Sequence, residues 1–522
     1  MRPIILMILD GWGIGEKTQS NAIEKAKIPN IKKIEKIYQG CSLQASGIAV
    51  GLPWNEAGNS EVGHLNMGGG RIIYQYLPKI SLSIKNSSFF KNPALLKTIN
   101  HVKSNNSFLH IMGLYSSGNV HSYLEHLYAI LELAQREKVE KLRLHCFLDG
   151  KDAPLKEGAK IIEELQEKMK NHNWKIASII GRFYALDRNK NWDRTQKAYN
   201  LLVNGEGEKT QNPIEKIKEF YSKDITDTYI PPITITDEDQ NLIGIIKNND
   251  GIIFFDFRED SARQLTKAFV LDDFSGFSRQ KLQNIIFCTM TQYEKNLPIE
   301  IVFPPIEIKN HLTEILSKAN KRILKIAETE KYAHVTYFFN GGKEEAYSNE
   351  TRQLIPSRIV SYYDEIPEMQ AEEITKTIIE GIKNNYDLII VNYANTDMIG
   401  HTGNFKAAVK AAECLDKNIE SIIKIAEDGE CILIITSDHG NIEQMMNVRT
   451  GEKKTKHTAN PVPFYLIGKE FKLKKPKTKE QIEKNYKIPS GLLSDIAPTI
   501  LELLKIPQPS EMTGRSLLGI LK

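Results

Sequence analysis

Residues 431–441 read Cys431-Ile-Leu-Ile-Ile-Thr-Ser-Asp-His-Gly-Asn441, an apolar run of strand length that ends in a carboxylate and an imidazole. A run this short, bounded by polar residues, predicts a strand buried on both faces of a parallel sheet. In open sheets of this kind, ligand-binding side chains collect at the carboxyl ends of the strands. Asp438 and His439 stand at that position, so the segment predicts an α/β fold with a site at one sheet edge.

Seven further apolar runs of the same type are distributed along the chain. They are Pro3–Leu9, Phe108–Gly113, Leu142–Leu148, Ile176–Ile180, Ile252–Phe257, Ile285–Met290 and Leu388–Asn392. Stretches with helical periodicity separate them, which is typical of alternating strands and helices. Polar residues follow directly after several of these runs: Asp10, Asp149 to Asp152, Arg182, Arg258 and Asp397.

The length of 522 residues exceeds what one hydrophobic core usually supports. The polar residues at the predicted strand ends fall into two groups, one from both ends of the chain and one from its middle. Two proline-bearing stretches, Tyr74–Ser83 and Pro298–Pro305, flank the middle block and are expected to be paired linkers. We therefore expect an outer domain, residues 1–75 and 310–522, and an inserted domain, residues 76–309.

Composition excludes several classes of protein. A formal charge of +4 is too small for a nucleic-acid-binding surface, and no dense basic tract is interleaved with aromatic residues. The apolar run at the N-terminus is too short for a signal-peptide core or a membrane span. Five scattered cysteines without a C-x-x-C pair indicate reduced thiols. We expect a cytoplasmic protein that works as a monomer on a small molecule, without nucleic acid or membrane.

Carboxylates and imidazoles recur at the ends of the outer strands. Asp397 and His401 are four residues apart, which places both on one face if the backbone is helical. Any one of these residues alone is more often a cap or a hydrogen-bonded side chain. Together they provide a mixed oxygen and nitrogen set that suits Mn²⁺ or Zn²⁺ better than Ca²⁺, and two divalent ions explain the whole set. Its members are Asp10, Asp397, His401, Asp438, His439 and His457.

Ser60 lies in Gly58-Asn-Ser-Glu-Val-Gly-His64, which lacks the G-x-S-x-G pattern of an elbow nucleophile. On its own the segment predicts only a helix cap at Asn59 or Ser60. Beside a pair of metal ions the interpretation changes, because a cation bound to the hydroxyl lowers its pKa and a second ion polarises a phosphoryl group. Ser60 is therefore the candidate nucleophile.

These motifs resemble the metal-site motifs of cofactor-independent phosphoglycerate mutase, a family of the alkaline phosphatase superfamily. The resemblance is carried by Asp10-Gly-Trp-Gly13, Asn59–His64, Asp397–Gly403, Ser437–Asn441, His457–Pro463, Ser494–Ile500 and Glu511–Gly514. It implies an alkaline-phosphatase-like parallel-sheet domain with a second α/β domain inserted into it. It also implies two divalent metal ions, Mn²⁺ first, with Zn²⁺, Co²⁺ or Mg²⁺ as alternatives, and no bisphosphoglycerate.

The resemblance assigns the residues of the outer domain to two metal ions. One ion would be held by Asp397, His401 and His457. The other would be held by four residues, with Ser60 also forming the phosphoserine: Asp10, Ser60, Asp438 and His439.

In the middle block, several arginines follow predicted strands, and planar guanidinium groups bind carboxylate and phosphate through two hydrogen bonds. A single such arginine is more often a surface ion pair. The resemblance implies that the inserted domain holds the glycerate portion of the substrate. The implied substrate-binding residues are His121, Lys151, Asp152, Arg182, Arg188, Arg258 and, past the return linker, Lys331.

Two residues depart from the family pattern. Lys151 and Ser261 stand where the family usually has arginine. Ser261 carries no charge, and Arg263 follows it by two residues, an offset that turns the side chain away if the segment is helical. Whether Arg263 substitutes for the missing arginine is open at this point.

The resemblance implies interconversion of 2-phosphoglycerate and 3-phosphoglycerate in glycolysis and gluconeogenesis through a phosphoserine. A metal-dependent phosphohydrolase or sulfohydrolase, or a sugar-phosphate mutase of the same superfamily, is an alternative with the same outer site. A catalytically inactive anion-binding or scaffold protein is a second alternative, suggested by the departures at Lys151 and Ser261. The complete ligand set and the run of arginines favour the mutase.

Overall fold

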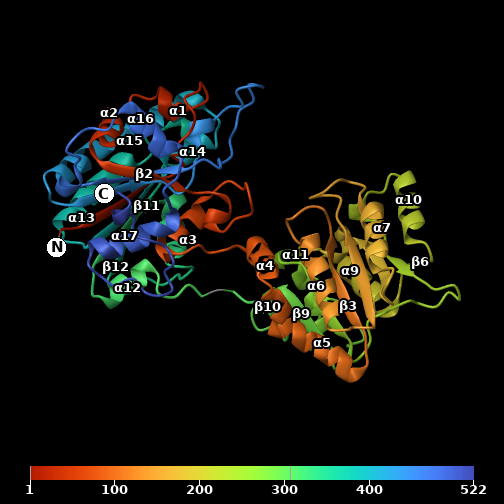
Figure 1. The fold of residues 1–522 in the computed structure, drawn as a ribbon. Coiled ribbons are helices and arrows are strands. Elements are labelled where there is room, and N and C mark those ends of the chain that lie inside the picture. Colours follow the sequence, from red (N-terminus) through yellow and green to blue (C-terminus); the bar gives the residue numbers. More distant parts are fainter. Residues whose placement is uncertain (1, 306, 522) are drawn as a thin grey trace. The chain divides into compact units, whose positions relative to one another are not determined.

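The computed structural model of this protein describes residues 2–305 and 307–521. The chain divides into two compact units, an outer unit (Met1–Gln75 with Glu307–Lys522) and an inserted unit (Tyr76–Ile306). Figure 1 shows that each unit consists of a sheet with helices on both faces. This is the α/β class that the apolar runs predict.

The outer unit is built on an eight-stranded sheet. Its strand order is β12 (Glu350–Ile355), β11 (Ile323–Glu328), β13 (Leu388–Tyr393), β1 (Ile4–Leu9), β14 (Ile432–Thr436), β15 (Val462–Ile467), β2 (Gln39–Gln44) and β16 (Gly491–Leu492). The five strands from β12 to β14 are parallel, and β15 is antiparallel to both of its neighbours. The carboxyl ends of β13, β1 and β14 therefore meet at one edge.

Helices cover both faces of this sheet, and β1 shows why its sequence is apolar throughout. Ile4, Leu6 and Ile8 enter one core cluster, and Ile5, Met7 and Leu9 enter the other. Since successive side chains of a strand point to opposite faces, a strand with two buried faces must be apolar at every position. The helices are α1 (Ala22–Lys25), α2 (Pro29–Ile37), α3 (Ser60–Gly69), α12 (Leu312–Lys318), α13 (Ala371–Lys383), α14 (Asn395–Gly400), α15 (Phe405–Glu427), α16 (Lys479–Lys487) and α17 (Ile496–Leu503).

The inserted unit has an eight-stranded sheet of its own. The order is β10 (Glu300–Phe303), β9 (Ile286–Thr291), β8 (Gly251–Phe254), β3 (Leu109–Tyr115), β4 (Leu142–Leu148), β5 (Lys175–Gly181), β7 (Ile233–Ile235) and β6 (Glu208–Thr210). All neighbours are parallel except β5 and β7. Its helices are α4 (Tyr76–Lys85), α5 (Pro93–Asn105), α6 (Leu124–Arg136), α7 (Gly158–Met169), α8 (Arg182–Ala185), α9 (Trp192–Asn204), α10 (Pro213–Ser222) and α11 (Glu259–Val270).

The expectation that two proline-bearing stretches are linkers is wrong. Tyr76–Lys85 forms α4, and Glu300–Phe303 forms β10 at the edge of the inserted sheet. Pro78 lies in the first turn of α4, where backbone nitrogens donate no hydrogen bond within the helix, so the missing N–H of proline costs nothing. Pro298 and Pro305 flank β10 without interrupting it. Proline thus marks the ends of elements here, and the chain passes between the units at residues 75/76 and 306/307.

Within the described residues, no helix combines the length and the apolar character needed to cross a bilayer.

Candidate active site

The candidate nucleophile begins α3. Asn59 caps this helix, its side chain accepting a hydrogen bond from the Val62 backbone N–H at 2.9 Å, and Ser60 is the first helical residue. A Cβ at Gly63 would lie 2.8 Å from the Cβ and carbonyl oxygen of Asp438, so only glycine permits the helix to approach that loop so closely. The predicted helix cap, Asn59, and the candidate nucleophile, Ser60, are therefore neighbours at the start of the same helix.

Three polar groups surround the hydroxyl of Ser60, which is almost fully buried. Its Oγ lies 2.9 Å from His439 Nε2 and 3.2 Å from Asp10 Oδ1, and it accepts a hydrogen bond from Lys331 Nζ at 2.8 Å. A hydroxyl held between a base, a carboxylate and an ammonium is arranged as a nucleophile needs to be.

Adjacent strands bring the three carboxylates of the set together. Asp10 follows β1, Asp438 follows β14, and Asp397 lies in α14 directly after β13. All three are buried. Since β13, β1 and β14 are parallel neighbours, residues far apart in the sequence meet at one sheet edge.

The three imidazoles of the set share one orientation. In each, Nδ1 faces a backbone carbonyl oxygen and Nε2 faces the carboxylates. The carbonyl acceptors are Thr455 for His401 (2.8 Å), Gly58 for His457 (2.9 Å) and Gly440 for His439 (3.3 Å). A carbonyl can only accept, so Nδ1 carries the proton and Nε2 keeps its lone pair, which is the usual arrangement of a metal-binding histidine.

The residues present fit divalent metal ions. Asp397, His401 and His457 place one ligand atom each within 4.8 Å of one another, and so do Asp10, Asp397 and His439. His401 Nε2 and His457 Nε2 lie 3.3 and 3.2 Å from Asp397 Oδ1 and 3.0 Å from each other. Lone pairs that converge at this spacing call for a cation between them.

Two further observations support a cation at this edge. Lys331 Nζ lies 2.7 Å from Asp10 Oδ1 and 2.6 Å from Asp397 Oδ2, so an ammonium already stands among the buried carboxylates. Asp438 Oδ2 is buried without a hydrogen bond, although His64 Nδ1 is 3.3 Å away, because that nitrogen donates to the Ser60 carbonyl oxygen. An orphaned carboxylate oxygen is costly unless a ligand satisfies it.

Burial and crowding shift the pKa values of these groups. Burial, with the Asp438 and Asp397 carboxylates, raises the pKa of Asp10. Burial alone would raise the pKa of Asp397 too, but Lys331 and the neighbouring imidazoles hold it below its usual value. Burial lowers the pKa of His439 to about 4, which keeps that imidazole neutral at pH 7.

Sequence reasoning missed residues that hold the carboxylates in place. Asn392 Nδ2, at the end of β13, donates to Asp10 Oδ2 at 2.6 Å and lies 3.1 Å from His64 Nε2. The Nδ1–H of His64 donates to the Ser60 carbonyl oxygen at 2.8 Å. The signal for His64 was its offset of four residues from Ser60 on a predicted helix. For Asn392 the only signal was its place at the end of an apolar run.

Glu443 was also missed, and it connects the loop after β1 with both ends of the segment between β14 and β15. Its buried carboxylate accepts hydrogen bonds from Gly13 N at 3.1 Å, Asn441 N at 2.8 Å and Asn460 Nδ2 at 2.9 Å. These donors come from the loops after β1 and β14 and from the segment before β15. Asn441 in turn donates to Asp397 Oδ1 at 2.8 Å. No sequence motif marked Glu443.

Arg182 is the centre of the polar cluster in the inserted unit. It follows β5 and donates to Asp149 Oδ1 and Asp152 Oδ2, each at 2.5 Å, and its Nη2 lies 2.8 Å from His121 Nε2. Burial, together with the Arg182 and Arg258 guanidinium groups, lowers the pKa of His121 to about 4. The loops after β3, β4 and β5 thus place these residues side by side.

Arg188 and Arg258 meet at a carboxylate that was not predicted. Arg188 Nη1 lies 2.6 Å from Asp260 Oδ2, and Arg258 donates to both oxygens of Asp260 at 3.1 Å. Both arginines keep about half of their side-chain surface exposed, 52% and 42%. They therefore have donors left for a ligand.

Lys151, Ser261 and Arg263 lie in different surroundings. Lys151 is exposed, and its backbone N–H donates to Asp149 Oδ1. Ser261 is buried in the first turn of α11. Arg263 turns away from the Arg182 cluster, because its Nε donates to the Tyr293 carbonyl oxygen at 2.8 Å and lies 3.6 Å from Glu294.

Two family models and several known proteins are similar to this chain. The family model described as "BPG-independent PGAM N-terminus" matches residues 80–295, and the model "Type I phosphodiesterase / nucleotide pyrophosphatase" matches residues 279–460. A 2,3-bisphosphoglycerate-independent phosphoglycerate mutase of Methanosarcina barkeri is 48% identical over 99% of this chain and 98% of its own length. One from Moorella thermoacetica is 44% identical with the same coverage.

A solved structure of Leishmania mexicana phosphoglycerate mutase, titled as determined at low cobalt concentration, is 28% identical and covers 98% of this chain and 97% of its own, with a TM-score of 0.56. The expected fold class and the resemblance read from the motifs are confirmed. With 48% identity along nearly its whole length, the chain belongs to the family of 2,3-bisphosphoglycerate-independent phosphoglycerate mutases.

Proposed function

We propose that this protein interconverts 2-phosphoglycerate and 3-phosphoglycerate through a phosphoserine at Ser60, without added bisphosphoglycerate. The surroundings of the Ser60 hydroxyl carry the proposal: His439, Asp10 and Lys331 approach it from three sides within 3.2 Å. The relatives that match over the full chain are named for this reaction.

Two divalent metal ions would complete the site. Asp397, His401 and His457 would hold one, and the other would be held by Asp10, Ser60, Asp438 and His439. When bound, the ions supply positive charge that lowers the pKa of the hydroxyl and neutralises the phosphoryl oxygens. The mixed carboxylate and imidazole donors favour Mn²⁺, with Zn²⁺, Co²⁺ or Mg²⁺ as alternatives.

The chain's own residues carry the two transfers. Ser60 Oγ forms a bond to phosphorus as the bond between phosphorus and the glycerate oxygen breaks; the Ser60 hydroxyl gives up its proton, and the freed glycerate oxygen takes up one, so the transfer balances. Glycerate then presents its other hydroxyl, which takes the phosphoryl group from Ser60. Lys331, within 2.8 Å of Ser60 Oγ, can keep the phosphoryl oxygens paired with positive charge through both steps.

The inserted unit would hold the glycerate portion of the substrate. Planar guanidinium groups suit its carboxylate, and His121 and Asp152 beside Arg182 suit its hydroxyl groups. The proposed residues in this unit are His121, Lys151, Asp152, Arg182, Arg188 and Arg258.

The five cysteines support a cytoplasmic location. We also expect the protein to be a monomer. All five are free thiols, and four of them are buried. Size-exclusion chromatography with light scattering tests the oligomeric state.

The decisive experiment measures conversion of 3-phosphoglycerate to 2-phosphoglycerate by metal-loaded protein with no bisphosphoglycerate present. Activity should disappear after exhaustive chelation and return with Mn²⁺, and Ser60→Ala should be inactive while still binding metal. Release of inorganic phosphate as the main product would favour a phosphohydrolase. Full turnover by Ser60→Ala would reject the phosphoserine.

A further inference from the structure

The outer unit contains a cavity of about 660 Å³ that none of the proposed metal ligands lines. Its walls come from the loop after β1, from α2, from β15 and from α16. Apolar side chains form much of its lining: Trp12, Ile14, Ile28, Pro463 and Ile482. The volume lies within the range of about 300–1,000 Å³ that is usual for small-molecule sites.

A largely buried carboxylate lies in the wall of this cavity. Glu35 Oε1, from α2, accepts hydrogen bonds from the Tyr486 hydroxyl at 2.5 Å and from the Tyr465 hydroxyl at 3.2 Å. Burial raises the pKa of this carboxyl. In the described part of the chain, no group donates to Glu35 Oε2, so this oxygen is available to a donor on a ligand.

Positive charge surrounds the same cavity. Lys477, half-buried, has no carboxylate within 4.0 Å among the described residues, and neither do Lys32, Lys36 and Lys479, which also line the cavity. A fifth lining lysine, Lys17, is neutralised by Glu483 at 2.8 Å. Five lysines and three glutamates (Glu24, Glu35 and Glu483) line the cavity, so its charge is net positive and attracts an anion.

The lysine-rich stretch 469–487 forms part of the wall of this cavity, which its composition does not indicate. Composition suggests a solvated surface excursion, and most of its lysines are exposed. Within it, however, Lys477 is drawn into the cavity wall, and its backbone N–H donates to the Lys36 carbonyl oxygen at 2.8 Å. The following helix α16 contributes Ile482 and Tyr486 to the same wall.

We propose that this cavity binds a small organic anion of the nucleoside monophosphate class. The phosphate would lie against Lys477 and the lysines at the rim. A ring that carries N–H donors would rest on the apolar lining and donate to Glu35 Oε2. The site is also joined to the active site, because the Trp12 backbone N–H donates to Ser437 Oγ at 3.0 Å, next to Asp438.

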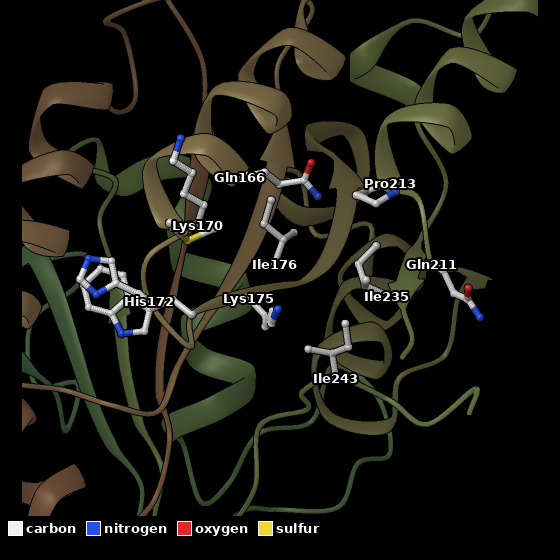
Figure 2. A pocket seen from close by; sticks show the side chains of 11 residues that line it. Gln166, Lys170, His172, Lys175, Ile176, Gln211, Pro213, Ile235 and Ile243 are labelled. Carbon is white, nitrogen blue, oxygen red and sulfur yellow. The ribbon is translucent and has the colours of Figure 1, made fainter. Parts of the chain in front are cut away.

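A second pocket, in the inserted unit, lacks these features. Its volume is about 310 Å³, and Ile176, Ile235 and Ile243 line it, with Lys170 and Lys175 among the surrounding side chains (Figure 2). Both lysines are exposed, and no buried carboxylate lines it. It offers an apolar surface without a buried charged group to select a ligand.

The test titrates adenosine 5′-monophosphate into the metal-loaded protein by isothermal calorimetry. We expect one site, with adenosine and inorganic phosphate each binding at least tenfold more weakly. Lys477→Met should weaken binding about ten- to hundredfold, the usual cost of one charge-assisted hydrogen bond. Ile482→Trp should weaken it similarly by filling the cavity. Lys475→Met, an exposed lysine of the same stretch outside the lining, is the matched control and should bind as the wild type does.

Both cavity variants should keep the wild-type circular dichroism spectrum, since Lys477 and Ile482 lie near the surface. No binding to the wild type at ~5 mM nucleotide, which corresponds to less than about 3 kcal/mol, would overturn the proposal. Binding that neither Lys477→Met nor Ile482→Trp weakens would overturn it equally. Both results are independent of the mutase activity.

Discussion

The orientation of Asn392 follows from the groups on either side of it. Its Nδ2 lies 2.6 Å from Asp10 Oδ2, and a carboxylate oxygen accepts hydrogen bonds only. The opposite amide orientation would set two acceptor oxygens against each other. His64 Nε2 must then accept from the same NH₂ group, which leaves Nδ1–H to donate to the Ser60 carbonyl. Asn392 and His64 therefore connect Asp10 to the helix that carries Ser60.

The first prediction tests this connection. Asn392→Ala removes the hydrogen bond to Asp10, so metal affinity should fall by about ten- to hundredfold, as is usual for groups that orient a ligand. Competition with a chelator of known affinity measures the change without any assay of activity. Asn395→Ala is the control, because this nearby buried amide donates to the carbonyl oxygens of Pro367 and Glu368. Equal metal affinity in Asn392→Ala and the wild type would contradict the positioning role.

The second prediction concerns the missing arginine at position 261. Arg258 lies at the same acidic partner as Arg188 and has exposed donors, whereas Arg263 faces Tyr293 and Glu294. Arg258→Ala should therefore raise KM by one to two decades, from the loss of ~1.5–3 kcal/mol, while Arg263→Ala changes KM little. Steady-state kinetics on 3-phosphoglycerate decides between them. A large rise in KM for Arg263→Ala would mean that Arg263 substitutes after all.

At the scale of elements, the apolar runs were informative because burial on both faces leaves no alternative to a continuous apolar sequence. Leu142–Leu148 forms β4 with the predicted bounds. The run Ile252–Phe257 was too long, since β8 ends at Phe254 and the following residues belong to the loop that holds Asp256 and Arg258. An apolar run indicates that residues are buried, not that they form a strand. The loop residues Phe255 and Phe257 are buried like the strand before them, so the sequence does not show where the strand ends.

The candidate site was predictable where a motif fixed the local geometry, and not where contacts cross between elements. Asp397 and His401 lie on α14 and at its end, as their spacing suggested. In contrast, Asp260 binds Arg188, which lies 72 residues away in the sequence, and Glu443 connects the loop after β1 with the segment between β14 and β15. Such contacts depend on strand order, which a single sequence does not specify.

The third prediction concerns β11, whose end leads to Lys331. Lys325 on this strand is fully buried, lies 3.3 Å from Glu350 and forms a hydrogen bond with Asn340. Lys331 lies between Lys325 and Asn340 in the sequence, so this hydrogen bond connects the two ends of the segment that carries Lys331. Burial lowers the pKa of Lys325 from 10.5 to about 7. Between these values the unfolded chain holds a proton that the folded chain has released. The free energy of unfolding should therefore rise as the pH increases from about 7 towards 10.

The measurement is the midpoint of thermal unfolding between about pH 6.5 and 9.5. The wild type should gain stability over this range, and Lys325→Met should gain less, because the titrating group is gone. Lys318→Met removes an exposed lysine of α12 that pairs with Glu314 and should keep the wild-type slope. Identical slopes for Lys325→Met and the wild type would show that Lys325 stays charged in the folded protein.

At the scale of the whole molecule, the chemistry is divided between two units. Ser60 and the candidate metal ligands belong to the outer unit, and the arginines proposed to hold glycerate belong to the inserted unit. A hydrolase would need only Ser60 and the metal ligands, because water takes the phosphate from the phosphoserine and no second substrate group has to be held. A mutase must also retain glycerate during the lifetime of the phosphoserine, so the second group decides the fate of the phosphate.

The last prediction follows from this division. Weakening the hold of the inserted unit on glycerate should let it escape before the phosphate returns, so water completes more of the turnovers. We expect Arg182→Met and Arg258→Ala to raise the ratio of inorganic phosphate released to phosphoglycerate isomerised, about tenfold or more if each guanidinium contributes one charge-assisted hydrogen bond. Added glycerate should lower the ratio again by recapturing the phosphoserine. Arg143→Met, an arginine of β4 that donates to the carbonyl oxygens of Leu142 and Ile243, controls for general damage to the unit. An unchanged ratio in both test variants, with normal conversion, would mean that glycerate is held by the outer unit.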